Sequence, residues 1–260
     1  MGNIRDRLYV ATFCDRYIEA IRDFGVGMEI NHTCISENLD EDGDKREKLI
    51  RDISSDIEES GAQRIILHGP FTEIIPAAID PLMRDMGMKR LKQGYDVAKH
   101  FGIRKMVVHN GWLPYMYFKS YQAEKGAEFW QKFMENKGRE FILAVENFLE
   151  DEPLMIRDMM ERIEDPRIRL CLDVGHANCM SSPRYGVEDW IRELGPYITH
   201  FHLHNNDGRS DTHNGFTDGT LDMEEVIGCA ESCCPGDVTY TIEAHPAYEC
   251  LELLAEKNLI

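Results

Sequence analysis

The segment HFHLHNNDGRSDTH, residues 200–213, places four histidines and two aspartates within fourteen positions. Imidazole nitrogens and carboxylate oxygens are the ligands that borderline and hard divalent cations prefer. A cluster of this density therefore predicts a metal site. The alternative is a polar surface loop, and the rest of the chain decides between the two.

Similar donor residues occur elsewhere in the chain, each at the end of a short apolar run. A donor directly follows each of five such runs: His68 follows RIIL, His109 follows KMVV, Glu146 follows LAV, Asp173 follows LCL and Glu243 follows TI. His202 belongs to the same set in the run that contains the histidine cluster. Buried ionisable groups left unpaired would cost several kcal/mol each, and a metal ion is the simplest partner that compensates them.

Short β-rich runs alternate regularly with segments of helical spacing along the whole chain. The runs that predict strands are residues 8–14, 27–35, 64–70, 105–111, 141–148, 168–175, 198–205 and 237–244. The clearest helical segments are residues 45–60, 81–102, 152–164 and 247–260. Gly61 and Gly102 lie at the ends of two of them, where a left-handed residue commonly closes a helix.

Continuous apolar strands that alternate with amphipathic helices predict a parallel sheet covered by helices. Eight such units match a single-domain α/β fold over residues 1–260, a (β/α)8 TIM barrel, and a doubly wound open sheet is the alternative. In a barrel the carboxyl ends of the strands converge on one mouth, so the donors would meet in one cavity. Glu29 could face the same mouth, whereas His200 lies deeper on its strand, where a core histidine is expected.

The composition disfavours several classes of protein. A chain of 260 residues that is 43% hydrophobic can bury a full core. Its start lacks a secretory apolar region and no stretch approaches the ~18 apolar residues of a membrane helix, so we expect a cytoplasmic protein without a membrane partner. The eight scattered cysteines are expected to be reduced thiols. A formal charge of −18, with no Lys/Arg block, disfavours binding to nucleic acid.

Six short motifs carry a resemblance to a known family. They are HGPF, VVHNG, VEN, LCLDVGH, HLHNNDG-x-x-D-x-H and TIE, in this order along the chain. Together they resemble the xylose isomerase-like TIM barrels, a superfamily that includes sugar phosphate isomerases and epimerases as well as endonuclease IV, an AP endonuclease of family 2. The resemblance covers essentially the whole chain.

The resemblance implies a metal centre, with two alternatives for its size. The isomerase and epimerase branch implies one divalent cation, usually manganese, magnesium or cobalt, held by Glu146, Asp173, His202 and Glu243. The endonuclease IV branch implies three zinc ions, held by these four together with His68, His109, His176, Asp211 and His213. All nine positions have the matching residue type.

Each alternative implies its own chemistry. In an isomerase or epimerase, the metal would stabilise the enediolate that forms when a carbon-bound proton leaves a sugar or sugar phosphate. Glu146 and Glu243 would exchange that proton as catalytic residues, and pure ligation is their alternative role. In a hydrolase, clustered metals would lower the pKa of a bridging water and clamp a phosphate oxygen.

The sequence departs from endonuclease IV around the mouth. Phe71 follows the HGP motif where that enzyme has a tyrosine, so a DNA-facing hydroxyl is missing. The loops at residues 36–44 and 148–153 carry carboxylates that would repel a duplex. We therefore expect a sugar or sugar-phosphate isomerase or epimerase. The alternatives are a phosphodiesterase acting on abasic DNA and a metal-bearing barrel without turnover.

Three further residues are candidates for contact with the substrate. Trp112 belongs to an aromatic segment, residues 111–122, that could close over a sugar; packing into the barrel top or a contact in a homo-oligomer is the alternative. Arg209 lies in the predicted metal-bearing loop and could pair with a phosphate, or it could bridge loop acids. His204 is expected to line the pocket.

Overall fold

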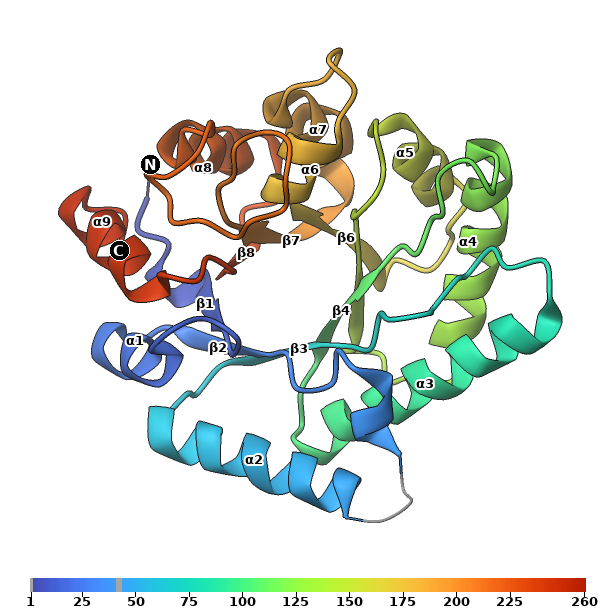
Figure 1. The fold of residues 1–260 in the computed structure, drawn as a ribbon, viewed down its shortest axis with the longest axis horizontal. Helices are drawn as coiled ribbons and strands as arrows, with labels where there is room; N and C mark the ends of the chain where they lie inside the picture. Colours follow the sequence, from blue (N-terminus) through green and yellow to red (C-terminus); the bar gives the residue numbers. More distant parts are fainter. Residues whose placement is uncertain (1, 41–43) are drawn as a thin grey trace.

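Within residues 2–40 and 44–260, the parts of the chain that the computed structural model describes, eight parallel strands close into a barrel (Figure 1). The strands are β1 (Leu8–Ala11), β2 (Gly27–Ile30), β3 (Ile65–His68), β4 (Lys105–His109), β5 (Ile142–Glu146), β6 (Ile168–Asp173), β7 (Ile198–Leu203) and β8 (Thr239–Ile242). Each strand pairs with its neighbours in sequence, and β1 pairs with β8. This closure confirms the predicted (β/α)8 barrel and excludes the open sheet.

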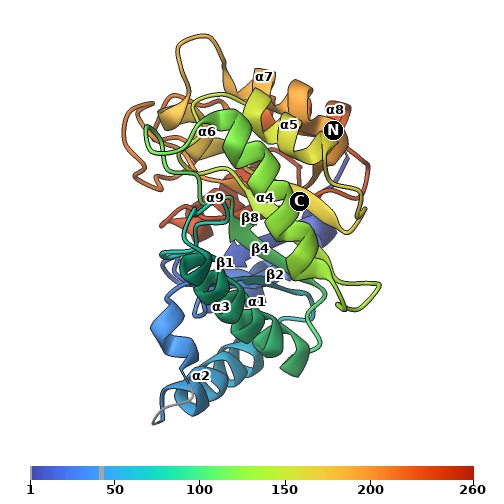
Figure 2. The same ribbon diagram turned by 90° about the vertical axis from the view of Figure 1, so that its right-hand side faces the viewer.

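Helices surround the barrel on its outside (Figures 1 and 2). They are α1 (Tyr17–Phe24), α2 (Lys45–Ser60), α3 (Pro81–His100), α4 (Lys119–Met134), α5 (Leu154–Glu161), α6 (Val174–Met180), α7 (Val187–Leu194), α8 (Met223–Cys233) and α9 (Ala247–Glu256), with short 3-10 turns at Arg5–Arg7, Ser36–Leu39 and Gly195–Tyr197. The bounds of α2 match the prediction, and Gly61 and Gly102 are both left-handed, with φ of 66° and 68°.

The short helix α6 was not predicted. It starts directly after Asp173, whose side chain accepts a hydrogen bond from His176 N at 2.6 Å.

The strands are shorter than the apolar runs that predicted them. For example, the run at residues 27–35 predicts a strand of which only Gly27–Ile30 is formed. Polar side chains beyond the strand ends take over the backbone hydrogen bonds of a neighbouring strand. Asn147 accepts from Asp173 N at 2.8 Å and donates to Asp173 O at 3.0 Å. The chain therefore leaves the sheet soon after each inward-facing donor.

The interior of the barrel is built in layers by the period of two along each strand. One buried cluster inside the barrel consists of Tyr9, Ile66, Val107, Ala144 and Cys171. Two residues further along four of these strands come His68, His109, Glu146 and Asp173. The alternation that forms the apolar layer thus also turns the donors inward, above it.

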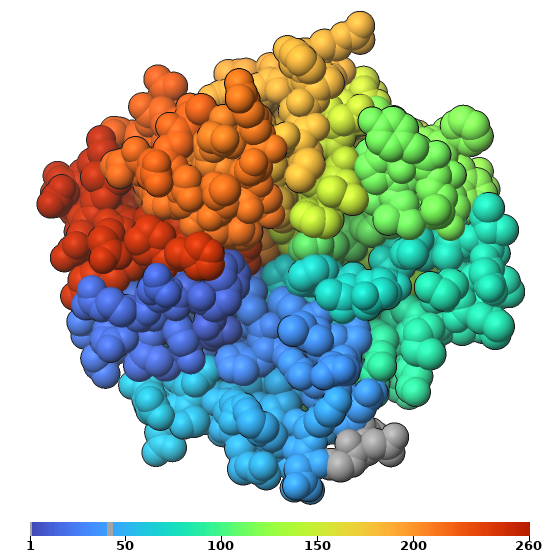
Figure 3. Space-filling view, in the orientation of Figure 1, coloured from blue at the N-terminus to red at the C-terminus, as the bar shows by residue number. Residues whose placement is uncertain are grey.

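Segments from both halves of the chain meet around the centre of the face seen in Figure 3. The two termini lie close together, because Ile4 N donates to Leu259 O at 2.8 Å (Figure 1). All eight cysteines are free thiols, as predicted. In the part of the chain that the structure describes, no helix combines the length and the apolar character needed to cross a bilayer.

Candidate metal centre

The predicted donors of the one-cation site come together at the carboxyl ends of the strands. Glu146, Asp173, His202 and Glu243 each offer a ligand atom, and these four atoms lie within 4.8 Å of one another. All four side chains are buried. They come from β5, β6 and β7 and from the residue directly after β8. The barrel therefore places them where a single cation could contact all four.

Two further groups of donors adjoin this one. His68, His109 and Glu146 form the first group, in which Glu146 is shared with the four donors above. The second group consists of His176, His204, Asp211 and His213. The structure thus assembles all nine residues that the endonuclease IV resemblance implied. It adds His204, which sequence reasoning had placed only near the substrate.

Three of these histidines are held in one tautomer by the backbone. In each ring Nδ1–H donates to a backbone carbonyl. His68 donates to Gly69 O at 3.0 Å, His176 to Asn147 O at 3.0 Å and His213 to Glu243 O at 2.7 Å. When such an imidazole is neutral it carries only this one N–H, so Nε2 of each ring then keeps a lone pair that can bind a cation. This Nε2 faces a carboxylate oxygen in His68 (Glu146 Oε2, 3.1 Å) and in His176 (Asp211 Oδ2, 3.2 Å). Two acceptors that face each other need a proton or a cation between them.

Several buried carboxylate oxygens of these groups lack a hydrogen-bond partner. They are Oδ2 of Asp173, Oδ1 of Asp211 and Oε1 of Glu243. Burying an unpaired polar group is costly, and more so when it is charged. A divalent cation offers these oxygens the compensation that the protein does not, so the donor set fits such an ion in chemistry as well as in spacing.

The carboxyl groups of the four-donor group differ in their proton affinity. Burial raises the pKa of Glu243, and the attraction of His202 offsets this only in part. Burial also acts on Glu146, but attraction to His202 and His109 holds its pKa well below the usual value. The pKa of Asp173 is lowered to about 2, because the attraction of His176 and His204 outweighs burial. The chain thus keeps Asp173 and Glu146 ionised and makes Glu243 the better proton acceptor.

Two phenylalanines cover the donors of the first adjoining group. Phe71 stacks on His109, with ring centroids 4.0 Å apart and an angle of 15° between the planes. Phe148 lies 4.9 Å from His109 and 5.0 Å from His176. Burial accordingly lowers the pKa of His109 to about 3. Sequence reasoning identified Phe71 only as a missing hydroxyl, and it did not single out Phe148, although this residue follows the VEN motif directly.

The three predicted substrate contacts lie in different surroundings. His204 is fully buried, with its Nε2 at 3.1 Å from Asp173 Oδ1 and its ring stacked on His213. Trp112 packs into the hydrophobic core and donates its indole N–H to Tyr117 O at 3.0 Å. Arg209 is exposed on the loop that carries Asp211. Neither Trp112 nor Arg209 is part of a donor group, and their roles stay predictions.

Glu29 and His200 lie beneath the four donors rather than among them. His200 is a satisfied core histidine, as predicted: it is fully buried and its two ring nitrogens contact Thr239 Oγ1 and Glu29 Oε2, at 2.6 and 3.0 Å. Burial would raise the pKa of Glu29, but attraction and hydrogen bonds from His202 and His200 hold it well below the usual value. Sequence reasoning missed Cys171, which forms another buried group with His200 and His202.

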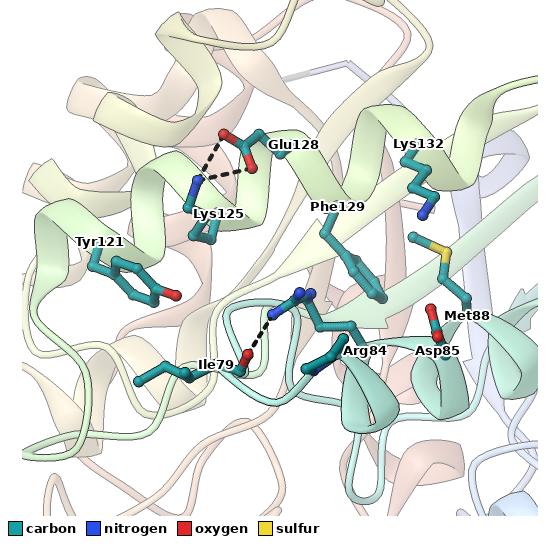
Figure 4. A pocket seen from close by; sticks show the side chains of 10 residues that line it. Ile79, Arg84, Asp85, Met88, Tyr121, Lys125, Glu128, Phe129 and Lys132 are labelled. Atoms are coloured by element: carbon teal, nitrogen blue, oxygen red, sulfur yellow. Dashed lines mark hydrogen bonds and ion pairs between the residues drawn. The ribbon is translucent and has the colours of Figure 1, made fainter.

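The outer surface also has hollows without this chemistry. One of about 510 Å³ lies between α3 and α4 (Figure 4). Three of its charged side chains are engaged with nearby groups: Lys125 pairs with Glu128 at 2.9 Å, and Arg84 donates to Ile79 O at 3.0 Å. Its lining includes no histidine or cysteine. The mouth therefore remains the candidate site. The acidic loop predicted there, residues 36–44, lies partly outside the described residues, at 41–43.

Comparisons with solved structures agree with the barrel. The chain is similar to a D-tagatose 3-epimerase-like protein with a TM-score of 0.78 and 18% identity, covering 97% of this chain and 98% of that one. It is also similar to an AP endonuclease of family 2 from Brucella melitensis, with a TM-score of 0.71 and 14% identity over 97% and 98% of the two chains. Identities this low show a shared fold alone.

One curated relative and one family match complete the comparison. An uncharacterized protein of Methanocaldococcus jannaschii, MJ1311, is 24% identical over 173 residues, which are 63% of this chain. The match spans 58% of that relative's length. The model of the xylose isomerase-like TIM barrels matches residues 18–230, which include eight of the nine predicted ligands. By this match, over most of its length, the chain belongs to the xylose isomerase-like TIM barrel family.

Proposed function

We propose that residues 1–260 form a single-domain, divalent-cation-dependent isomerase or epimerase of a sugar or sugar phosphate. The observation that carries the proposal is the four-donor group, in which Glu146 and Glu243 share one centre with Asp173 and His202. Isomerisation or epimerisation of a ketose through an enediolate requires an acceptor for a carbon-bound proton beside a group that stabilises oxyanions. Two carboxylates at one candidate cation site meet both requirements.

Glu146, Asp173, His202 and Glu243 would hold the cation. When bound, a divalent cation acts as a Lewis acid that stabilises negative charge on the carbonyl and hydroxyl oxygens of the sugar. Manganese, magnesium, cobalt and zinc all accept this mixture of oxygen and nitrogen ligands. The roles of the four residues as ligands are part of the proposal.

Glu243 is the better placed of the two glutamates to take the proton. Its Oε1 has no hydrogen-bond partner, and its pKa is raised. Glu146 has both oxygens engaged, Oε1 with His202 and Oε2 with His68, each at 3.1 Å. In the proposed reaction Glu243 takes the proton as the C–H bond breaks and the electron pair moves towards the carbonyl oxygen. Glu146, ionised at first, takes up a proton from a sugar hydroxyl or from water and delivers it to the neighbouring carbon or to the opposite face. Glu243 releases its proton to the sugar oxygen or to water, so both carboxyl groups return to their starting states.

Other residues would bind the sugar and exclude water. Phe71 and Phe148 already cover the histidines at the mouth, and a dry site strengthens electrostatic stabilisation. Trp112, His204 and Arg209 remain the proposed substrate contacts. Arg209 is the one cation among them suited to a phosphate group, because its guanidinium can donate two parallel hydrogen bonds.

A hydrolytic phosphodiesterase acting on abasic DNA is the second candidate. The two adjoining donor groups favour it, because clustered cations suit in-line displacement at phosphorus. The formal charge of −18 opposes it, since an acidic surface repels a duplex. Phe71 also opposes it: the ring stacks on His109, and it lacks the hydroxyl with which the tyrosine of endonuclease IV would contact DNA. The isomerase or epimerase is therefore the better supported function.

Exchange with solvent deuterium tests the proposal. The protein, loaded with Mn²⁺, Mg²⁺, Co²⁺ or Zn²⁺, is incubated in D₂O with a panel of ketoses and their phosphates, and carbon-bound deuterium is measured by NMR. We expect incorporation into at least one sugar, and its loss in Glu146→Gln and Glu243→Gln. Nicking of an abasic duplex without any deuterium incorporation would establish the second candidate instead. Inactivity in both assays with cation bound would indicate a barrel without turnover.

A further inference from the structure

Glu29 is a fully buried carboxylate that contacts two histidines at once. It lies on β2, inside the barrel, and none of its surface is exposed. Its Oε1 is 3.1 Å from Nε2 of His202, and its Oε2 is 3.0 Å from Nε2 of His200. The hydroxyl of Thr241 donates to Oε2 as well. An ionised carboxylate only accepts hydrogen bonds, so all three neighbours direct a donor towards Glu29.

The two ring nitrogens of His202 therefore face different carboxylates. Its Nε2 faces Glu29, and its Nδ1 faces Glu146 Oε1 at 3.1 Å and Glu243 Oε2 at 3.4 Å. When Nε2–H donates to Glu29, Nδ1 carries the lone pair and points at the four-donor group. In the opposite tautomer, Nδ1–H would point at the cation position and His202 could not act as a ligand.

A half-buried lysine favours one direction of the hydrogen bonds on the far side of Glu29. Lys105 Nζ lies 2.8 Å from Thr239 Oγ1, and this oxygen lies 2.6 Å from Nδ1 of His200. An ammonium group has donors but no acceptor, so Thr239 must accept from Lys105. The hydroxyl proton of Thr239 has two candidate acceptors, Nδ1 of His200 at 2.6 Å and Thr199 O at 3.3 Å. Donation to the closer Nδ1 leaves Nε2–H of His200 to donate to Glu29. Every step of this chain presents a donor to the carboxylate.

We propose that Glu29 is a positioning residue for the metal centre: it fixes the tautomer of His202 so that Nδ1 is directed at the cation, and Lys105, Thr239 and His200 hold Glu29 in place. The inference rests on the proposed cation site, not on the proposed reaction. Carboxylates that accept from the second nitrogen of a ligating histidine orient the ring and raise its basicity as a ligand.

The substitution Glu29→Gln tests this role with almost no change in volume. A carboxylate can accept from both histidines, but an amide has one oxygen and one NH₂ group. The NH₂ group of the glutamine would then face the Nε2–H of one of the two histidines, unless that histidine changes its tautomer. We expect the affinity of the purified protein for Zn²⁺ alone, measured by competition with a chelator, to fall about 10- to 100-fold.

Glu150→Gln is the matched control. Glu150 is also a buried glutamate near the mouth, but it accepts from the Asn110 side chain at 2.8 Å and from Phe148 N at 2.6 Å rather than from a histidine. We expect Glu150→Gln to keep the Zn²⁺ affinity within about twofold of the wild type. Circular dichroism of each metal-free variant checks that the barrel is folded.

Nitrogen NMR of the unsubstituted protein tests the same proposal without relying on the folding of a variant. In Zn²⁺-loaded, uniformly ¹³C,¹⁵N-labelled protein, we expect His202 to have a protonated Nε2 and a metal-bound Nδ1, with its ring signals assigned by through-bond correlations to its own backbone. Binding through Nε2, or a Zn²⁺ affinity of Glu29→Gln equal to that of the wild type, would overturn the role of Glu29. Failure of the wild type to bind any divalent cation would overturn the metal centre and this inference together.

Discussion

Lys105 at the start of β4 contacts Thr239 at the start of β8 across the barrel interior, with Nζ and Oγ1 2.8 Å apart. Lys105 Nζ also donates to Thr199 O at 3.1 Å. Among the hydrogen bonds and ion pairs recorded for the described residues, none joins Lys105 to a carboxylate. Burial lowers the pKa of this lysine from 10.5 to about 8.

This depressed pKa predicts how stability depends on pH. Between pH 8 and 10.5 the unfolded chain still binds the lysine proton while the folded protein has released it, so the free energy of unfolding rises with pH. Lys105→Met removes this contribution. We expect the wild type to gain up to about 3 kcal/mol relative to the variant between pH 7 and 11, measured by urea unfolding. A difference that stays constant over this range would contradict the prediction.

Removal of bound cations should destabilise the protein. The buried oxygens of Asp173 and Glu243 without partners lose their compensation when the cation leaves. A ligand that binds only the folded state stabilises it by roughly 3 to 4 kcal/mol at 100 to 1,000 times its dissociation constant. We expect EDTA to lower the free energy of unfolding by this amount in the wild type and by much less in Asp173→Asn. Equal unfolding curves with and without EDTA would argue against a resident cation.

Gly175 on α6 leaves room for the ring of His204. A Cβ built on Gly175 would lie 2.0 Å from His204 Cε1, and the ring cannot retreat freely because it stacks on His213 at 3.9 Å. We expect Gly175→Ala to lower the free energy of unfolding by about 1 to 3 kcal/mol, despite the better helix propensity of alanine. It should also reduce the cation content of the group that His204 shares with Asp211.

Gly236→Ala serves as the control for this substitution, because a Cβ there would meet no atom within 4 Å. Urea unfolding and metal analysis of both variants provide the measurement. If Gly175→Ala retained both the stability and the cation content of the wild type, the packing of His204 against α6 would be of no consequence for the site.

Arg209 should distinguish a sugar phosphate from a free sugar. If its guanidinium pairs with a phosphate, Arg209→Gln will raise the KM for a phosphorylated substrate about tenfold or more and leave kcat and the KM for the free sugar nearly unchanged. Arg51→Gln, on the exposed face of α2, is the charge-matched control. An equal effect of Arg209→Gln on both substrates would assign the arginine to the structure of its loop.

Local sequence patterns predicted much of the fold. The alternation of apolar runs and amphipathic segments gave the order of strands and helices, and α2 begins and ends at the predicted residues. Strand ends were less accurate, because side chains such as Asn147 replace ladder hydrogen bonds in a way that apolar periodicity does not reveal. The short helix α6 was missed because Asp173, already identified as a donor, also caps it.

Closure of the barrel decided which inward-facing residues meet. In the pairing of β2 with β3, Glu29 lies opposite Ile66 rather than opposite His68, so its carboxylate lies one layer below the donors. His109 lies opposite Glu146, and Asp173 lies opposite His202, which brings these four residues to the mouth. This register determines that Glu29 supports His202 from below.

The sequence by itself predicted the type of fold and the inward direction of the donors at the strand ends, because side-chain alternation along a strand is a local property. The nine candidate ligands came from the resemblance to a family, and their role as ligands stays a prediction. The tertiary structure alone decided that His204 joins the donor group of Asp211, that Phe71 covers His109 and that Lys105 contacts Thr239. These contacts join residues far apart in the chain. Their distances depend on the stagger of strands around a closed cylinder, which no local pattern encodes.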